Sequence, residues 1–158
     1  MSNWPAAFFD RRAGVGCPHC IEGRPSETEH GARFYEGRSS DGYLQRSAPT
    51  PGYSVVIFRE RHVADLQSMN VDELTRFWSE VAIVSRAIGQ VFQPVHLNVQ
   101  LLGNAVPHVH VHLVARYDPD PAPCQPLPSA AWENAQNLGE SELRAQLDAL
   151  TTTLGGNL

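Results

Sequence analysis

The chain has 158 residues, of which 42% are hydrophobic and 18% are charged, a length that suits one domain with a sizeable core. Twelve basic residues against seventeen acidic ones give a net charge of −5, and the basic residues are scattered along the chain. This balance excludes a protein that binds long nucleic acids through a basic stripe. The composition also excludes a disordered chain and a disulfide scaffold.

Compartment and membrane association follow from the apolar runs and the cysteines. The longest clean apolar run is 53–58, far short of the ~20 residues that a membrane span needs. Residues 1–12 show no basic start followed by an apolar segment, so no secretory signal is expected. Two of the three cysteines lie in Cys17-Pro18-His19-Cys20, a spacing that favours metal or redox chemistry over a structural disulfide. We therefore predict a cytoplasmic protein with no membrane partner.

The first half of the chain predicts an irregular start followed by strands. Residues 1–29 are rich in Gly, Pro and charge without sustained periodicity. Residues 32–36 and 43–46 are predicted strands, joined by the turn-rich segment 37–42. The β-branched and aromatic run 53–58 predicts a buried central strand.

One long helix is well marked. Asn70 is a suitable N-cap, and Glu73 three positions later completes a capping-box pattern. Apolar residues recur at helical spacing and end before Pro94. They are Leu74, Phe77, Trp78, Val81, Val84, Ile88 and Val91.

The second half predicts two more strands and a last helix. Apolar residues alternate with polar ones in 95–101 and again in 109–114, which is typical of strands. Five prolines make 118–128 irregular, and leucines at 143, 147, 150 and 154 predict an amphipathic helix. Together these elements predict an α+β fold with a central antiparallel sheet of about five strands, one main helix and a C-terminal helix.

The segment 108–114 carries the strongest functional signal. Alternate side chains of a strand point to the same face, so His108, His110 and His112 are expected to line one side of the sheet. Two kinds of chemistry remain open: a metal site with three His ligands, or an imidazole nucleophile that attacks phosphorus while its neighbours hold the phosphate. Asn98 and Asn104 supply amide groups nearby that can bind phosphate without adding charge. His19, His30 and His96 are given no role.

These residues resemble a known family. Residues 103–114, Gly-Asn-Ala-Val-Pro-His-Val-His-Val-His-Leu-Val, resemble the His-φ-His-φ-His-φ-φ signature of the histidine triad family of nucleotide hydrolases and transferases. Residues 51–57 and 61–63 look like the second block of that family. The similarity covers roughly 15–118, which predicts a domain flanked by an N-terminal extension at 1–14 and by a Pro-rich tail and helix at 119–158. Within the family, the segment is most similar to bacterial members described as diadenosine tetraphosphate hydrolase-like.

The resemblance implies an enzyme that releases a nucleoside monophosphate from a dinucleoside polyphosphate or a nucleoside phosphoramidate. His110 would be the nucleophile and form a covalent nucleotidyl intermediate, and His112, Asn98 and Asn104 would contact the phosphate. A homodimer with a nucleotide substrate and no organic cofactor is also implied. Arg46 departs from the family pattern at the ribose-binding position, which leaves nucleotide specificity open.

The resemblance also implies a structural zinc. Cys17 and Cys20 alone make half a zinc site, and His62 and His108 stand at the positions that complete it in some family members. Such a site would have four protein ligands and no open position for substrate. The alternatives are a pair of reduced surface cysteines with His62 in the core, or a redox-active cysteine pair.

Two alternatives to the hydrolase remain open from the sequence. The first is a metallohydrolase in which His108, His110 and His112 are the ligands. The second is a nucleotide-binding sensor that has the same fold but weak or no catalysis, which the departures at Arg46 and Ala105 make plausible.

Overall fold

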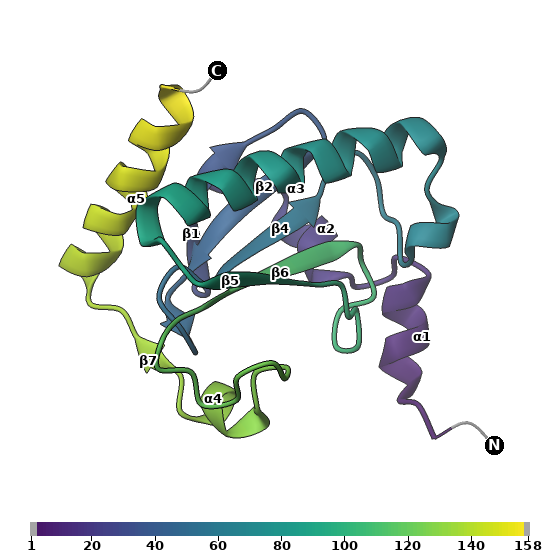
Figure 1. Ribbon diagram of the computed structural model, residues 1–158. Coiled ribbons are helices and arrows are strands. Elements are labelled where there is room, and N and C mark those ends of the chain that lie inside the picture. Colours follow the sequence, from purple (N-terminus) through teal and green to yellow (C-terminus); the bar gives the residue numbers. More distant parts are fainter. Residues whose placement is uncertain (1–2, 157–158) are drawn as a thin grey trace.

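A five-stranded antiparallel sheet forms the centre of the molecule in the computed structural model, which describes residues 3–156 (Figure 1). The strand order is β1-β2-β4-β6-β5, and all neighbours are antiparallel. The strands are β1 (Gly31–Glu36), β2 (Ser40–Gln45), β4 (Ser54–Phe58), β5 (His96–Gln100) and β6 (His110–Arg116). This arrangement confirms the predicted α+β fold class.

The main helix, α3 (Val71–Phe92), lies across one face of the sheet (Figure 1). Its predicted capping box is present: the Asn70 side chain accepts from the Glu73 N–H, and the Glu73 carboxylate accepts from the Asn70 N–H, both at 2.9 Å. The helix ends at Phe92, two residues before Pro94, and Gln93 between them has the left-handed conformation, with φ 48°.

The two faces of the sheet carry different side chains, as the alternation in β6 predicts. Val111 and Leu113 of β6 join the core beneath α3. His110 and His112 lie on the opposite face, because they are paired across the strands with Ile57 and Val55 of β4. The apolar half of β6 thus anchors the strand in the core and presents its histidines to the other side.

The C-terminal helix, α5 (Glu140–Gly155), belongs to the same core. It packs beside α3 and the edge strand β1 (Figure 1). The four leucines that predicted the helix are all buried in the main core cluster, namely Leu143, Leu147, Leu150 and Leu154. The helix that follows the Pro-rich tail therefore contributes to the stability of the sheet.

Replacing Leu150 with alanine should lower the free energy of unfolding by about 3 kcal/mol, because a fully buried leucine leaves a cavity when it is truncated. Urea denaturation followed by circular dichroism measures the change. The matched control is Thr151→Ala on the exposed side of the same helix, for which a change within about 0.5 kcal/mol is expected. Equal stability of the two variants would show that α5 does not hold the core together.

The prediction that residues 1–29 are irregular is wrong, because that segment contains α1 (Ala6–Arg12) and α2 (Pro18–Glu22). The structure also adds η1 (Leu66–Ser68), α4 (Ser129–Glu133) and a small sheet in which β3 (Ser47–Ala48) pairs with β7 (Gln136–Asn137). Each of these elements spans seven residues or fewer, which is too short for a periodic pattern to show in the sequence.

The predicted turn at 37–42 is also wrong in extent, because β2 already begins at Ser40. The buried carboxylate of Glu80 on α3 accepts from the Ser39 N–H at 3.0 Å and from the Ser40 hydroxyl at 2.5 Å. Asp41 is fully buried and paired with Arg24. Tertiary contacts therefore convert a run of typical turn residues into a strand.

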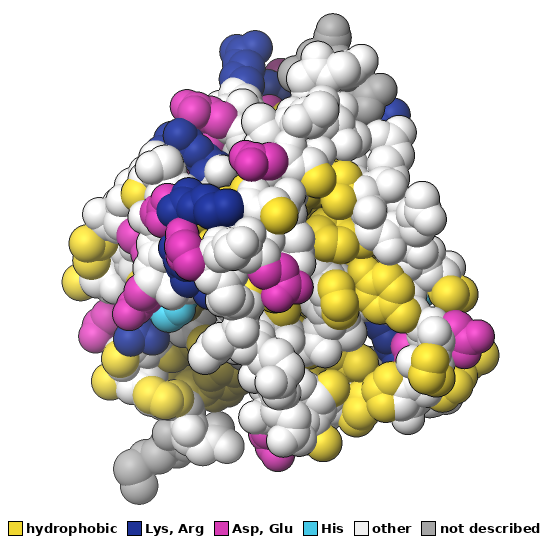
Figure 2. All heavy atoms as spheres, turned by 90° about the vertical axis from the view of Figure 1, so that its left-hand side faces the viewer, with side chains coloured by type: hydrophobic (Ala, Val, Ile, Leu, Met, Phe, Trp, Pro, Cys, Tyr) yellow, Lys and Arg dark blue, Asp and Glu magenta, His cyan; other side chains and the backbone are white. Residues whose placement is uncertain are grey.

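The charged side chains near α5 are mostly paired with opposite charges. On this side of the molecule, basic and acidic side chains lie beside one another (Figure 2). Arg144 of α5 contacts both Glu140 and Glu27, and Arg46 contacts the same two carboxylates. Across residues 3–156, no helix combines the length and the apolar character needed to cross a membrane.

Candidate active site

A cavity of about 350 Å³ opens on the face of the sheet opposite α3. Strands β2, β4 and β6, the start of α2 and the loop 102–106 all contribute to its lining. His110, His112 and Asn104 line it, so the structure brings these three predicted site residues together. Its volume lies at the lower end of the range of small-molecule sites, about 300–1,000 Å³.

The ring of His110 is held in one tautomer. Its Nδ1 lies 2.6 Å from the carbonyl oxygen of His108, and since a carbonyl oxygen can only accept, Nδ1 carries the proton. Burial lowers the pKa of His110 from its ordinary value, which favours the neutral ring. His110 therefore has an unprotonated Nε2, the form of imidazole that can act as a nucleophile.

Tyr53 positions His112. The Tyr53 hydroxyl lies 2.7 Å from Nδ1 of His112, and the two rings are stacked. Burial raises the pKa of Tyr53 to about 12, so the phenol keeps its proton and can donate it to Nδ1. This contact favours the tautomer of His112 that has its proton on Nε2, where it can serve a phosphate oxygen. The local sequence pattern predicts only a strand at Tyr53 and does not indicate this contact with His112.

Two further histidines line the cavity, although sequence analysis gave them no role. His19 and His30 are both lining residues. The ring of His19 lies 5.1 Å from that of His110, and burial lowers the pKa of His19 to about 3. Its position between the two cysteines is the signal in the sequence, because α2 and its N-cap Cys17 place both sulfurs beside His108.

The structure does not bring Asn98 to this cavity. Its Oδ1 accepts from Arg116 Nη1 at 2.7 Å, and Arg116 is buried and pairs with Asp120 in the Pro-rich tail. Asn98 therefore lines a separate cavity beside the tail. Arg46, which stands at the family's ribose position, is paired with Glu27 and Glu140 and is not among the lining residues.

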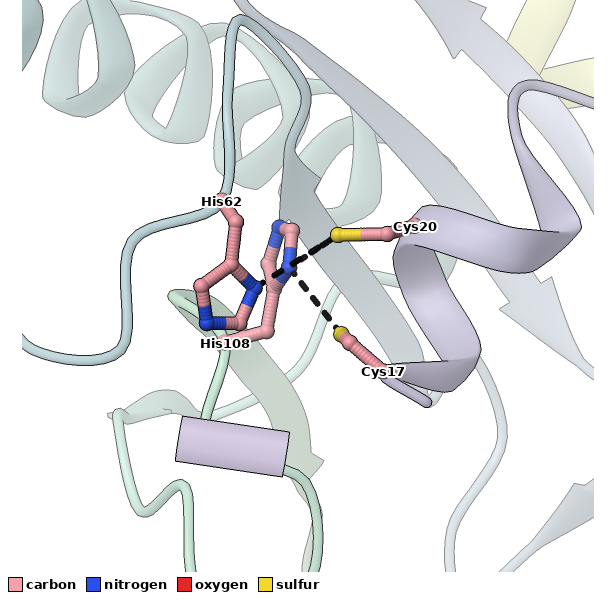
Figure 3. A group of neighbouring side chains, drawn as sticks. All are labelled: Cys17, Cys20, His62 and His108. Carbon is pink, nitrogen blue, oxygen red and sulfur yellow. Dashed lines mark hydrogen bonds between the residues drawn. The ribbon is translucent and has the colours of Figure 1, made fainter. Parts of the chain in front are cut away.

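The four predicted metal ligands form a cluster next to the active-site cavity (Figure 3). Cys17 and Cys20, at the start of α2, face His62 and His108, and the ligand atoms of all four lie within 4.8 Å of one another. Nδ1 of His108 is 3.5 Å from each sulfur, and Nδ1 of His62 is 3.5 Å from the sulfur of Cys20. These residues could hold a metal ion.

Both imidazoles of this cluster are oriented as metal ligands. Nε2 of His108 lies 2.7 Å from the Phe58 carbonyl, and Nε2 of His62 lies 3.2 Å from the Arg12 carbonyl. The Nε2 atoms therefore donate, which leaves each Nδ1 free to bind a metal. Tetrahedral zinc places its sulfur and nitrogen ligands about 3.5 Å apart, so the donor set and its spacing fit a structural zinc.

Comparison with known families decides the identity of the fold. Residues 29–119 match the HIT domain, more than half of the chain. The chain belongs to the HIT family. The match includes the histidine strand and His62, whereas the two cysteines of this HIT protein lie before it.

Individual relatives agree with this assignment. The asymmetrical bis(5′-nucleosyl)-tetraphosphatase of Schizosaccharomyces pombe is 30% identical over 92 residues, which are 55% of this chain and 50% of that protein. The HIT protein thus spans about half the length of this curated relative. A histidine triad protein from Bradyrhizobium japonicum has a TM-score of 0.68 at 21% identity, over 80% of this chain and 92% of its own. A zinc-bound family member from Mycobacterium smegmatis has a TM-score of 0.58 at 20% identity, over 79% and 84% of the two chains.

Proposed function

We propose that this HIT protein releases a nucleoside monophosphate from a nucleoside 5′-phosphate that carries a leaving group, through a covalent intermediate on His110. The observation that carries the proposal is the fixed tautomer of His110, whose Nδ1–H is held by the His108 carbonyl in a cavity of nucleotide size. The tetraphosphatase among the relatives supports the same class of reaction.

The chemical step follows from this tautomer. Nε2 of His110 attacks the α-phosphorus, and the bond between phosphorus and the leaving group breaks as the bond between nitrogen and phosphorus forms. The substituted ring keeps its Nδ1 proton and is positively charged, which the carbonyl dipole of His108 stabilises. Water then attacks the phosphorus, the imidazole leaves, and the nucleoside monophosphate is released.

The lining of the cavity suggests how the substrate lies. Tyr43 and Gln45 of β2, with Val55 and Ile57 of β4, line the part built by the sheet, which suits the flat face of a nucleobase. The phosphate would lie between His112 and Asn104, because both offer neutral N–H donors to its oxygens. The phosphate contact predicted for Asn98 stays a prediction, since Asn98 is held by Arg116.

The three-histidine metallohydrolase receives no support from the geometry. His108 is grouped with Cys17, Cys20 and His62, and within the described residues no cluster of metal-ligand atoms includes His110 or His112. His110 and His112 instead contact the His108 carbonyl and the Tyr53 hydroxyl. We therefore assign the metal and the nucleophile to separate sites.

Mass spectrometry of enzyme quenched during turnover tests the proposal. With adenosine 5′-phosphoramidate or diadenosine tetraphosphate as substrate, we expect an adenylyl adduct on the peptide that contains His110. Turnover without any adduct would contradict the covalent route. Tight nucleotide binding without turnover would instead identify a sensor.

Replacing Tyr53 with phenylalanine should lower kcat about tenfold, because the variant no longer fixes the tautomer of His112. The measurement is steady-state hydrolysis of the phosphoramidate. The matched control is Tyr117→Phe, whose hydroxyl donates to the Pro51 carbonyl outside the cavity lining. Equal kcat in the two variants would show that Tyr53 does not position His112.

We also propose that the ion held by Cys17, Cys20, His62 and His108 is zinc and that it has a structural role. Four protein ligands would complete its tetrahedron, so the ion would tie α2 to the start of β6 and leave no position for substrate. Cys17 and Cys20 form no disulfide and face the two histidines. A reducing cytoplasm, which is the compartment that we propose, would keep both available as ligands.

The open edge of the sheet supports the predicted homodimer. Strand β5 has β6 as its only partner in the described sheet. Val99 on this strand and Val95 just before it are exposed. We propose that two copies pair along this edge, because an exposed apolar edge strand is a template for pairing. Analytical ultracentrifugation should give a mass twice the 17.4 kDa of the chain. A monomer at micromolar concentration would contradict this arrangement.

A further inference from the structure

A second cavity lies on the other side of the active-site loop. It has a volume of about 360 Å³ and is lined by α1 and the preceding Trp4, by residues 101–104 and Pro107, and by Ala64 and Asp65. Arg12 and Asp65, the two charged lining residues, pair with each other. Leu102, Gly103 and Asn104 line both this cavity and the one that contains His110. These three residues therefore separate the two cavities, and a ligand that extends across them would occupy both.

Aromatic rings form the α1 wall of the second cavity. Trp4 and Phe8 lie with ring centroids 4.4 Å apart, and Phe9 meets Phe8 edge to face at 5.7 Å. Trp4 is 49% exposed and Phe9 is 47% exposed, so both rings have surface that a ligand can contact. Planar aromatic surfaces of this kind bind nucleobases by stacking.

The charge distribution points to the same place. Nine of the twelve arginines pair with carboxylates within the described residues, and no Arg or Lys lines the cavity that contains His110. Arg11 at the end of α1 has no carboxylate partner in this part of the chain. Its Nη1 donates to the carbonyl of Ala105, a lining residue of the first cavity, at 3.2 Å. A guanidinium has five N–H donors, so Arg11 can bind an anion from the loop's edge.

We propose that α1 forms the subsite for the leaving group: Arg11 binds the phosphates beyond the scissile bond, and Trp4, Phe8 and Phe9 bind the distal base of a dinucleoside polyphosphate. This inference rests on the proposed function and names its substrate class. The first cavity has room for one nucleoside monophosphate, so the second nucleoside must lie outside it. The lining of the first cavity contains no Arg or Lys but does contain Glu22, so a cation for the polyphosphate has to come from outside that lining, and Arg11 is placed to supply it.

Two substrates that share the same adenylyl group test the proposal. Diadenosine tetraphosphate has a large anionic leaving group, whereas adenosine 5′-phosphoramidate releases only ammonia. In Arg11→Gln and in Phe9→Ala we expect kcat/KM for the tetraphosphate to fall about tenfold and kcat/KM for the phosphoramidate to change by less than about twofold. Arg86→Gln is the matched control, because Arg86 is exposed on α3 and also lacks a carboxylate partner among the described residues.

The outcomes separate the subsite from a structural role of Arg11. If Arg11 only holds the loop through the Ala105 carbonyl, both substrates lose activity equally, and the subsite is refuted. Titration calorimetry with diadenosine tetraphosphate that has a methylene group between the α- and β-phosphorus gives a readout without turnover. We expect its Kd to rise about tenfold in Arg11→Gln. An unchanged Kd overturns the inference. If the wild type hydrolyses neither substrate but Arg11→Gln still weakens binding of the analogue, only the proposed reaction is overturned.

Discussion

His110→Ala is expected to lower kcat for the phosphoramidate and for diadenosine tetraphosphate by on the order of 10⁴-fold or more, since removal of a nucleophile closes the covalent route. His110 is the histidine in the cavity whose Nδ1 is fixed by a backbone carbonyl. Alanine removes both the attacking nitrogen and this hydrogen bond. Single-turnover kinetics with a large excess of enzyme measure the loss without interference from product release.

Two comparisons make the His110 result specific. His110→Asn retains polarity and should be as inactive as the alanine variant, because an amide is a poor nucleophile. His96→Ala removes an exposed histidine on β5 that lies outside the His110 cavity and should keep kcat within about twofold of the wild type. If kcat of His110→Ala stayed within about tenfold of the wild type, another group would have to be the nucleophile.

Cys17→Ser is expected to abolish zinc binding and to lower the melting temperature by about 10 °C. Cys17 is fully buried, and its sulfur lies 3.5 Å from Nδ1 of His108, so serine would leave the tetrahedron incomplete. When the free zinc concentration is about 1,000 times the Kd, binding contributes about 4 kcal/mol to the free energy of unfolding, and the variant loses this contribution. Each kcal/mol shifts the melting temperature of a domain of this size by about 2–4 °C. Mass spectrometry of bound metal and differential scanning calorimetry give the two readouts.

Cys124→Ser is the matched control for this experiment. Cys124 is the third free cysteine, is exposed in the Pro-rich tail and takes no part in the cluster. The control should retain one zinc per chain and the melting temperature of the wild type. Equal zinc content in Cys17→Ser and Cys124→Ser would refute the metal site, and zinc loss without a lower melting temperature would refute its structural role.

The parts of the fold that sequence predicts well are those that local pattern determines. The Asn70–Glu73 cap, the alternation of His and Val in β6 and the leucine spacing of α5 all appear in the structure as predicted. In each case, one element's own periodicity or capping chemistry specifies the structure.

The parts that sequence misses depend on distant contacts. The run Ser39 to Gly42 has turn composition, but Glu80 on α3 and Arg24 satisfy its polar groups within the sheet. Likewise, the local sequence gives no reason for Asn98 to bond with Arg116, whose other partners lie in the tail. A polar residue's role therefore depends on which charged group the fold places beside it.

The contacts of Tyr53 with His112 and of His19 with His110 could not be predicted either, because they too depend on residues that are distant in the sequence. Tyr53 meets His112 only because β4 and β6 are neighbours in the sheet, although 59 positions separate the two residues. His19 reaches the cavity because it lies on α2, which the contacts of Cys17 and Cys20 with His108 hold beside the histidine strand. Sheet topology and metal-site geometry create these contacts together.

His108 connects two processes that would otherwise be independent. Its side chain faces the cysteines, while its backbone oxygen orients the ring of His110, which we propose as the nucleophile. If the proposed zinc and nucleophile are both present, loss of the zinc would free the His108 side chain and so disturb the carbonyl that orients His110. Nucleotide turnover would then depend on the zinc supply, because one residue, His108, contacts both the metal site and His110.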